Sequence, residues 1–326
     1  MFSSVLSPIG TKKIGFWLKI SVFAGLVTYI GYVLHQQRFD WTVVQHQLRV
    51  VRNPERWAIL LVSLTPFNWG LEALKWQILL QRVEKTSFGD AFRGVLAGLS
   101  LGFALPAQLG DTAGRVLSLR TSARAEAIGA SLVSGGMQFY VAIVFGTVAW
   151  AHHLSTAPTR NNLAGQGLLT LLLGFSALGV GFGLVRRQVI GWLATWAMLR
   201  RFAGYWHVAG AYDDSEIGLA LAAAALRYLV FSGQFYAAMQ LVGVELPLGV
   251  SVSGIGVVFL AKTVTPAFNL LSDLGVREAA SLWVFEPFGA PAPVLVTATL
   301  TLWVANILLP VLIGLIWVWR LKWSVR

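Results

Sequence analysis

The chain has 326 residues, is 56% hydrophobic and has a mean hydropathy of +0.68, with a formal net charge of +11. Only 12% of its residues are charged, about half the usual share in a soluble domain, which indicates a membrane protein. Because the chain has no cysteine, disulfides, thiolate chemistry and iron–sulfur sites are excluded, and its five histidines show no metal-ligand spacing.

Six apolar stretches are long enough to cross a hydrocarbon core of ~30 Å as helices. They cover 14–34, 57–80, 125–150, 163–185, 217–243 and 292–319. Because the backbone in lipid must satisfy its own hydrogen bonds, we predict an all-α polytopic membrane protein. The first stretch is too long for a signal peptide and lacks a small-x-small cleavage site, so we expect a retained span.

Two further apolar stretches, 91–120 and 247–290, differ from these spans. Each is broken near its middle by Pro, Gly and an acid, in the segments 103–111 and 265–273. Proline removes a backbone donor and disfavours helix in the residue before it, and each remaining piece is short for a span. We therefore predict two re-entrant broken hairpins, each entering and leaving the membrane on one side.

The distribution of Lys and Arg predicts the orientation. With neither hairpin crossing and a cytoplasmic N-terminus, 16 of the 25 basic residues lie in the cytoplasm and 7 outside. Both termini are therefore expected in the cytoplasm. The loop 35–56 is an exception, since it carries four arginines. Its tryptophans and acids suggest a short interfacial helix on the outer surface, and contact with anionic headgroups is the alternative.

Residues 186–216 lie between the two halves of the chain. Trp192, Trp196 and Leu199 recur at i, i+4 and i+7 between two pairs of arginines. This pattern is typical of a helix at the headgroup level, so we predict a cytoplasmic interfacial linker.

A shift of 160 residues aligns the two broken stretches with each other. It pairs Pro106 with Pro266, Gly94 with Gly254, Gly89 with Gly249 and, after a short slip, Arg115 with Arg277. Three predicted crossings separate equivalent points, and an odd number inverts the second copy. Within a single membrane domain of 1–326, we predict an inverted-repeat helical bundle with repeats 57–150 and 217–319. Secondary transporters are built this way, with a site near the midplane.

Charges in the broken stretches are the candidate site. Arg115 and Arg277 each follow a break, and an aspartate lies four residues before each of them, at Asp111 and Asp273. An Asp and an Arg at i, i+4 can form a salt bridge on one helix face, with the Asp as N-cap. Alternatively, the helix N-termini and guanidiniums face a phosphate, which Arg binds bidentately. The two readings are compatible.

Other charges lie in apolar surroundings and need partners or water. Glu278 is expected to neutralise Lys262 or to serve as a proton-coupling carboxylate. Glu72 and Lys75 have the i, i+3 spacing of a buried structural pair. Arg227 has no local partner, so we expect it to find one across helices or to snorkel.

At these motifs the sequence resembles the transmembrane, flippase-like domain family of lysylphosphatidylglycerol synthetases, the multiple peptide resistance factors. The first element is Leu105-Pro-Ala-Gln-Leu-Gly-Asp-Thr-Ala-Gly-Arg115, and the second is Pro266 followed by Leu274-Gly-Val-Arg-Glu278. A less specific similarity lies at Lys75-Trp76. The resemblance covers roughly 14–320 and implies a lipid flippase with two re-entrant hairpins in the cytoplasmic membrane of a prokaryote.

Because the chain ends soon after its last span, we expect the soluble synthase domain of the bifunctional relatives to be absent. Lipid aminoacylation is therefore not carried over from the resemblance. Stand-alone members of the family resemble carriers of diverse lipids, including polyprenyl-phosphate-linked sugars.

These observations together predict a flippase for an anionic, phosphate-bearing lipid or a polyprenyl-phosphate-linked headgroup, with no cofactor, metal or nucleic-acid partner. The candidate substrate-binding residues are Arg115, Arg277, Asp111, Asp273, Glu278 and Lys262. A membrane-embedded transferase or hydrolase acting on a lipid-linked substrate is one alternative, and a lipid-binding scaffold is another. Oligomerisation stays open.

Overall fold

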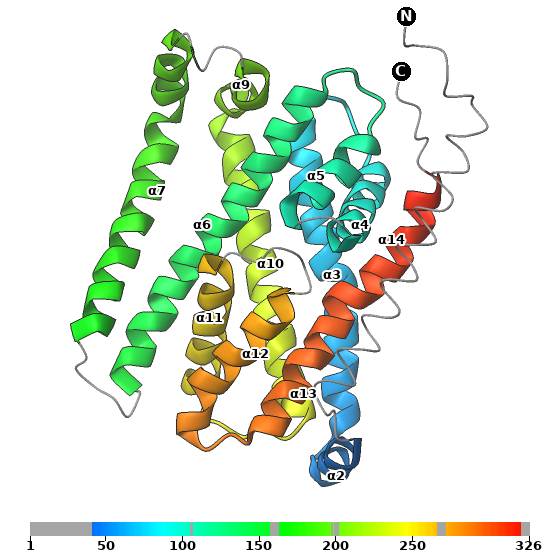
Figure 1. Cartoon of the computed structure of the whole chain (residues 1–326), viewed down its shortest axis with the longest axis vertical. Helices are drawn as coiled ribbons and strands as arrows, with labels where there is room; N and C mark the ends of the chain where they lie inside the picture. The colour runs from blue at the N-terminus through cyan, green and yellow to red at the C-terminus, as the bar shows by residue number, and fades with distance from the viewer. Residues whose placement is uncertain are drawn as a thin grey trace, which may run out of the picture.

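The structure is a computed structural model with full side chains. It describes residues 41–104, 107–156, 163–196, 198, 202–265 and 272–320. Within these ranges the regular elements are helices and no strand occurs. Figure 1 shows a bundle in which the longest helices run from one end of the molecule to the other. The all-α class is therefore confirmed for the described part of the chain.

Five helical stretches of the described residues are long and apolar enough to cross a membrane. They are α3 (Pro54–Leu80), α6 (Arg124–Thr156), α7 (Leu163–Thr195), α10 (Asp214–Leu241), and the continuous run of α13 (Ala292–Trp303), η2 (Val304–Leu308) and α14 (Leu309–Arg320). They correspond to five of the six predicted spans. The predicted span 14–34 lies outside the described residues.

Helix α7 is longer than its predicted span of 163–185, since it continues to Thr195. Arg186 and Arg187, the first of the two arginine pairs in the predicted linker, lie within this helix. Arg186 donates to the backbone oxygen of Tyr212 at 3.0 Å, so its charge is accommodated without ending the helix. The shorter α9 (Ala203–Ala211) follows in the segment predicted as an interfacial linker.

Two pairs of shorter helices lie where the broken stretches were found. The pair α4 (Phe88–Ala104) and α5 (Ala107–Leu117) occupies the upper half of Figure 1, and the chain enters and leaves it at the upper end. The pair α11 (Leu248–Val264) and α12 (Ser272–Phe285) occupies the lower half, with its outer ends at the lower end.

Glycines allow close approach within the first pair. A Cβ added to Gly110 would lie 2.3 Å from the backbone oxygen of Leu101, and one added to Gly114 would lie 2.6 Å from that of Ala97. Small residues at such contacts let helix backbones touch inside a membrane. The glycines of α5 therefore allow its backbone to contact that of α4.

The core is built around α3 and α10, which pack along each other and run in opposite directions in Figure 1. Their facing sides bury large apolar groups, including Trp76, Leu79, Phe235 and Met239. Helix α6 packs against α10 and α11, whereas α7 lies at the edge of the bundle beside α6 and α9. Much of the apolar surface of α7 is consequently exposed, as expected for a helix that faces lipid.

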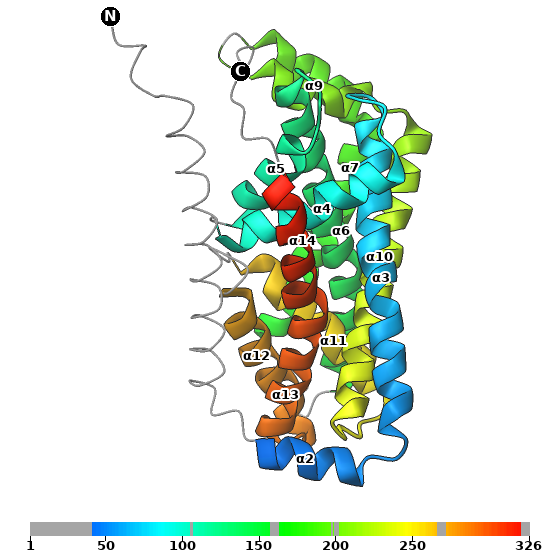
Figure 2. The same ribbon diagram turned by 90° about the vertical axis from the view of Figure 1, so that its right-hand side faces the viewer.

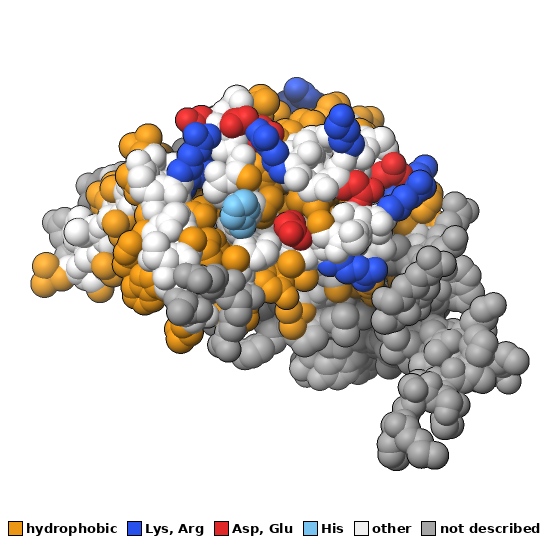
Figure 3. Space-filling view, turned by 90° about the horizontal axis from the view of Figure 1, so that it is seen from above, with side chains coloured by type: hydrophobic (Ala, Val, Ile, Leu, Met, Phe, Trp, Pro, Cys, Tyr) orange, Lys and Arg blue, Asp and Glu red, His pale blue; other side chains and the backbone are white. Residues whose placement is uncertain are grey.

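A short helix, α2 (Trp41–Val50), lies across the lower end of the bundle in Figure 2, at a steep angle to α3. It falls within the loop 35–56, where a short helix was predicted. The opposite end is seen in Figure 3, where Lys and Arg side chains alternate with Asp and Glu over the upper surface.

Candidate functional site

A buried cluster of charged side chains is centred on the carboxylate of Glu72. One carboxylate oxygen lies 2.9 Å from Lys75 Nζ, and the other lies 2.9 Å from Arg115 Nη1. The first oxygen also lies 3.4 Å from Arg227 Nε. Arg115 extends the cluster, because its Nε donates to Asp111 Oδ1 at 3.0 Å. We call these five residues the Glu72 cluster.

Three helices contribute to the Glu72 cluster, and local spacing explains part of it. Glu72 and Lys75 are three residues apart on α3, and Asp111 and Arg115 are four apart on α5, so each pair shares a helix face. Both predicted pairs are thereby confirmed. The contact between Glu72 and Arg115 joins them, and it was not predicted from the sequence.

Arg227 enters the cluster from α10. The expectation that it finds a partner across helices is confirmed, since it contacts Glu72 on α3 and its Nη1 donates to Gln138 Oε1 on α6 at 3.1 Å. An arginine without a local partner in an apolar span was the signal for this pairing in the sequence.

Exposure differs across the Glu72 cluster. The side chain of Lys75 is 1% exposed, and those of Glu72 and Arg115 are also buried. Asp111 is 31% exposed and Arg227 is 28% exposed. The cluster is therefore closed around Lys75 and accessible where Asp111 and Arg227 lie.

The charges of the cluster do not balance. Lys75, Arg115 and Arg227 supply three positive charges, while Glu72 and Asp111 supply two negative ones. An uncompensated charge is costly in apolar surroundings, by ~2.5–3.5 kcal/mol on insertion scales. The excess of one positive charge therefore favours binding of an anion.

Neighbouring groups fix the orientation of the cations. The guanidinium of Arg115 lies over the ring of Trp76, 5.5 Å from its centroid, and Lys75 Nζ donates to the backbone oxygen of Ser134 at 3.2 Å. The indole N–H of Trp76 is buried and has no hydrogen-bond partner within the described residues. A ligand oxygen beside Arg115 would suit this donor.

The second predicted set lies on α11 and α12. Arg277 is 0% exposed, and its guanidinium lies 5.6 Å from the ring centroid of Phe231 on α10. The next residue, Glu278, is also buried, and Lys262 is partly buried near the end of α11. The side chain of Asp273 lies outside the described residues, and so do the breaks at Pro106 and Pro266.

Helix α10 connects the Glu72 cluster with Arg277. Arg227 and Phe231 are four residues apart, so they lie on one face of α10 and are separated by a rise of about 6 Å. Arg227 contacts Glu72, and Phe231 lies against Arg277. Arg277 thus lies against this face of α10 directly, whereas Arg115 is linked to it through the carboxylate of Glu72.

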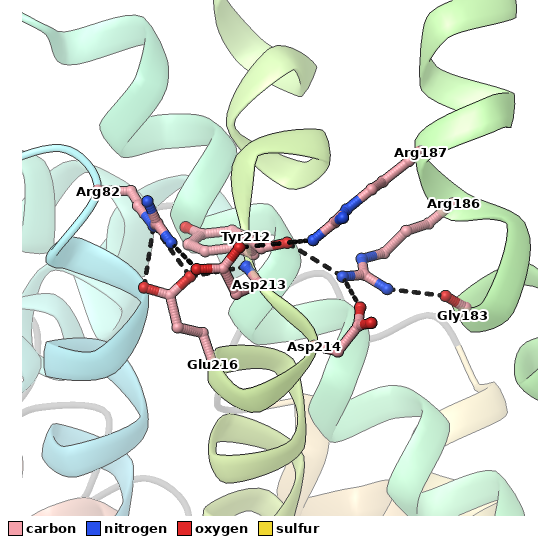
Figure 4. Close-up of polar contacts among 8 residues, drawn as sticks. All are labelled: Arg82, Gly183, Arg186, Arg187, Tyr212, Asp213, Asp214 and Glu216. Atoms are coloured by element: carbon pink, nitrogen blue, oxygen red, sulfur yellow. Dashed lines mark hydrogen bonds and ion pairs between the residues drawn. The ribbon is translucent and has the colours of Figure 1, made fainter.

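A different charged network lies at the upper end of the bundle and is drawn in Figure 4. Arg82 at the end of α3 pairs with Asp213 and Glu216 at the start of α10. Arg186 and Arg187 on α7 pair with Asp214 and Asp213. Here three arginines face three carboxylates, so the charges balance.

This balanced network has a structural role. It ties α3 and α7 to the first turn of α10, where Asp213 and Glu216 form a capping box. Burial raises the pKa of the Tyr212 phenol, which stays protonated and donates to the backbone oxygen of Leu79 at 2.8 Å. A charge-balanced, internally bonded network offers no excess charge to a ligand, in contrast to the Glu72 cluster.

In the described residues, no group of three or more His, Asp or Glu is arranged to hold a metal ion.

Comparisons with known proteins give one match. The sequence profile of the family described as "Lysylphosphatidylglycerol synthase TM region" matches residues 16–314, and no synthase domain is detected. No curated protein and no solved structure matches the chain.

Proposed function

Because this chain belongs to the lysylphosphatidylglycerol synthase TM region family, a membrane domain associated with lipid flipping, we propose that it moves an anionic, phosphate-bearing lipid across the bilayer. The substrate class includes anionic phospholipids and polyprenyl-phosphate-linked headgroups. The observation that carries the proposal is the excess positive charge of the Glu72 cluster, buried among apolar spans.

A phosphate suits this cluster chemically. A guanidinium presents parallel N–H donors that match two oxygens of a phosphate. Arg115 is held in place by Glu72, Asp111 and the Trp76 ring, so little side-chain freedom is lost when a ligand binds. The anion would neutralise the excess charge that the protein itself leaves uncompensated.

The arrangement of the helices supports two inverted repeats, 57–150 and 217–319. Helices α4 and α11 have 17 residues each, and the shift of 160 residues brings their first and last residues into register. Helix α10 runs opposite to α3, and α13–α14 runs opposite to α6. In this proposal α4–α5 and α11–α12 are re-entrant hairpins that enter from opposite sides.

Such symmetry provides a route for the headgroup. Arg115 comes from one hairpin and Arg277 from the other; Arg115 shares the carboxylate of Glu72 with Arg227 of α10, and Arg277 lies against Phe231 of the same helix. In our proposal the two arginines bind the phosphate in turn or together as one repeat rocks against the other. Asp111, Asp273 and Glu278 orient the arginines or contact a cationic part of the headgroup, and Lys262 adds positive charge at the second hairpin.

The test is transport by purified protein in phosphatidylcholine vesicles that contain trace acyl-labelled phosphatidylglycerol. We expect the protein to speed movement of this anionic lipid between leaflets, relative to protein-free vesicles and to trace labelled phosphatidylcholine. Mass spectrometry of the recovered lipid should show an unchanged mass. A new lipid species formed in proportion to protein would instead support a transferase or hydrolase. Binding without movement would support a scaffold.

A further inference from the structure

A second buried polar cluster, whose side chains carry no charge, lies further along α3 and α10, the two helices that it shares with the Glu72 cluster. Asn68 Nδ2 donates to Asn306 Oδ1 at 2.5 Å and to Gln234 Oε1 at 3.3 Å. Gln234 Nε2 in turn donates to Thr65 Oγ1 at 2.9 Å. These four residues come from α3, α10 and the segment η2, and all four are buried. We call them the amide cluster.

The amide cluster is incompletely satisfied. Asn68 is 2% exposed, yet its Oδ1 has no hydrogen-bond donor among the described residues. A buried acceptor without a donor carries its full desolvation cost, so such an atom is retained where something else supplies the donor. Asn68 Oδ1 can therefore accept a hydrogen bond from one more N–H or O–H group.

The backbone around Asn306 is also unusual. Residues Val304–Leu308 form a π-helical segment, and Leu309 N–H bonds to the oxygen of Val304. Pro310 has no N–H, so it cannot donate to the oxygen of Asn306 as the next α-helical turn would require. Single π-helical turns inside α-helices are frequent at functional sites. The last span thus departs from regular helix where it supplies its amide.

The amide cluster continues directly from the Glu72 cluster. Asn68 and Glu72 are four residues apart on α3, and Gln234 is seven residues after Arg227 on α10, so each pair shares a helix face. The rise from Glu72 to Asn68 is about 6 Å. A short polyol or sugar attached to a phosphate spans a distance of that order.

We propose that the amide cluster is a second subsite, which binds hydroxyl groups of the headgroup whose phosphate lies at the Glu72 cluster. This inference rests on the proposed function. A hydroxyl group donates one hydrogen bond and accepts others, so it can serve Asn68 Oδ1 and exchange bonds with the neighbouring amides. A cation fits less well, because the adjacent cluster already carries excess positive charge.

Two lipids of equal charge test the subsite. Phosphatidylglycerol and phosphatidylethanol are both singly charged phosphodiesters, but only the first carries headgroup hydroxyls. The vesicles are phosphatidylcholine with a trace of either acyl-labelled lipid. The wild-type protein should move phosphatidylglycerol about tenfold faster than phosphatidylethanol, because phosphatidylethanol cannot make one or two of the hydrogen bonds that the site provides. Equal rates would overturn the subsite and leave anionic lipid transport standing. Movement of neither lipid would overturn the proposed function as well.

A variant locates the selectivity. Asn68→Leu keeps the side-chain size and removes the amide, so it should lower phosphatidylglycerol movement to the rate of phosphatidylethanol. Thr147→Val is the matched control, because Thr147 is also buried and hydrogen-bonded but lies on α6 outside both clusters. It should keep the tenfold preference. A preserved preference in folded Asn68→Leu would overturn the assignment to Asn68, and if that variant does not fold, the wild-type comparison of the two lipids still decides.

Discussion

The guanidinium of Arg227 on α10 lies 3.4 Å from the carboxylate of Glu72 on α3, inside the bundle. The two residues belong to different halves of the chain, and the same carboxylate also contacts Lys75 and Arg115. Glu72 is thus the shared counter-ion of three cations. An arriving anion would compete with it for Arg115 and Arg227, which links headgroup binding to the contact between the halves.

Removing the charge of Glu72 should destabilise the protein strongly. Glu72→Gln leaves three cations facing Asp111 alone, and loss of one partner of a buried ion pair costs about 3–5 kcal/mol. We expect a lower thermal unfolding midpoint in detergent. The control is Glu245→Gln, which alters an exposed carboxylate between α10 and α11 and should leave the midpoint unchanged. Equal midpoints for the two variants would show that Glu72 does not hold the cluster together.

Arg227 should contribute to transport although the sequence did not place it in the site. Arg227→Gln removes the excess positive charge and should lower the initial rate of phosphatidylglycerol movement about tenfold, the loss expected for one charge-assisted contact. Arg227→Lys keeps the charge and should lie between this variant and the wild type. Exposed Arg120→Gln serves as the control. Wild-type rates for folded Arg227→Gln would remove this residue from the site.

Arg277 should require a planar guanidinium. Its side chain is fully buried over Phe231, where lysine can supply the charge but neither the stacked plane nor a bidentate contact. We expect Arg277→Lys to fold and to move phosphatidylglycerol about tenfold more slowly, a loss comparable to one charge-assisted contact. Exposed Arg120→Lys should match the wild type. If Arg277→Lys transports at the wild-type rate, as Arg120→Lys should, a positive charge alone is sufficient at position 277.

Cysteine labelling tests the topology, since the chain has no cysteine of its own. Lys85→Cys and Ser122→Cys flank the pair α4–α5, and Glu245→Cys and Glu286→Cys flank α11–α12; all four positions are exposed. A membrane-impermeant maleimide should label the first two from the cytoplasm and the last two from outside. If the two probes of one pair are labelled from opposite sides, that pair crosses the membrane and is not a re-entrant hairpin.

The sequence predicted what depends on local patterns. Uninterrupted apolar stretches predicted five described spans, because length and hydropathy alone decide whether a helix can cross a membrane. Spacing predicted the Asp111–Arg115 and Glu72–Lys75 pairs, because residues three or four apart share a helix face. The continuation of α7 to Thr195, beyond the predicted span, was not predicted, and the contact of Arg186 with Tyr212 depends on packing between segments.

Contacts between helices were harder to predict. Glu72 meets Arg115 and Arg227 because the fold brings an arginine of α5 and one of α10 to α3, and no local spacing encodes these contacts. The same holds for Phe231 beneath Arg277 and for the amide cluster, whose members come from three helices. Uncompensated charges and amides in apolar spans were the available signal, since each must find a partner somewhere in the fold.

The central claim is that the guanidinium of Arg115 binds the headgroup phosphate and does more than pair with its neighbours. The double change Asp111→Asn with Arg115→Gln removes one charge of each sign, so Lys75 and Arg227 still exceed Glu72 by one positive charge. The net charge of the cluster is kept, and the folding defect of a single change should be relieved. The double variant therefore isolates the guanidinium from the salt bridge.

The decisive measurement is the initial rate of phosphatidylglycerol movement by this double variant, per mole of folded protein in phosphatidylcholine vesicles. If Arg115 binds the phosphate, the variant folds with a thermal midpoint near that of the wild type and moves the lipid at least about tenfold more slowly, as for loss of a charge-assisted contact. A folded double variant that transports at the wild-type rate would show that Arg115 is structural and would contradict the account.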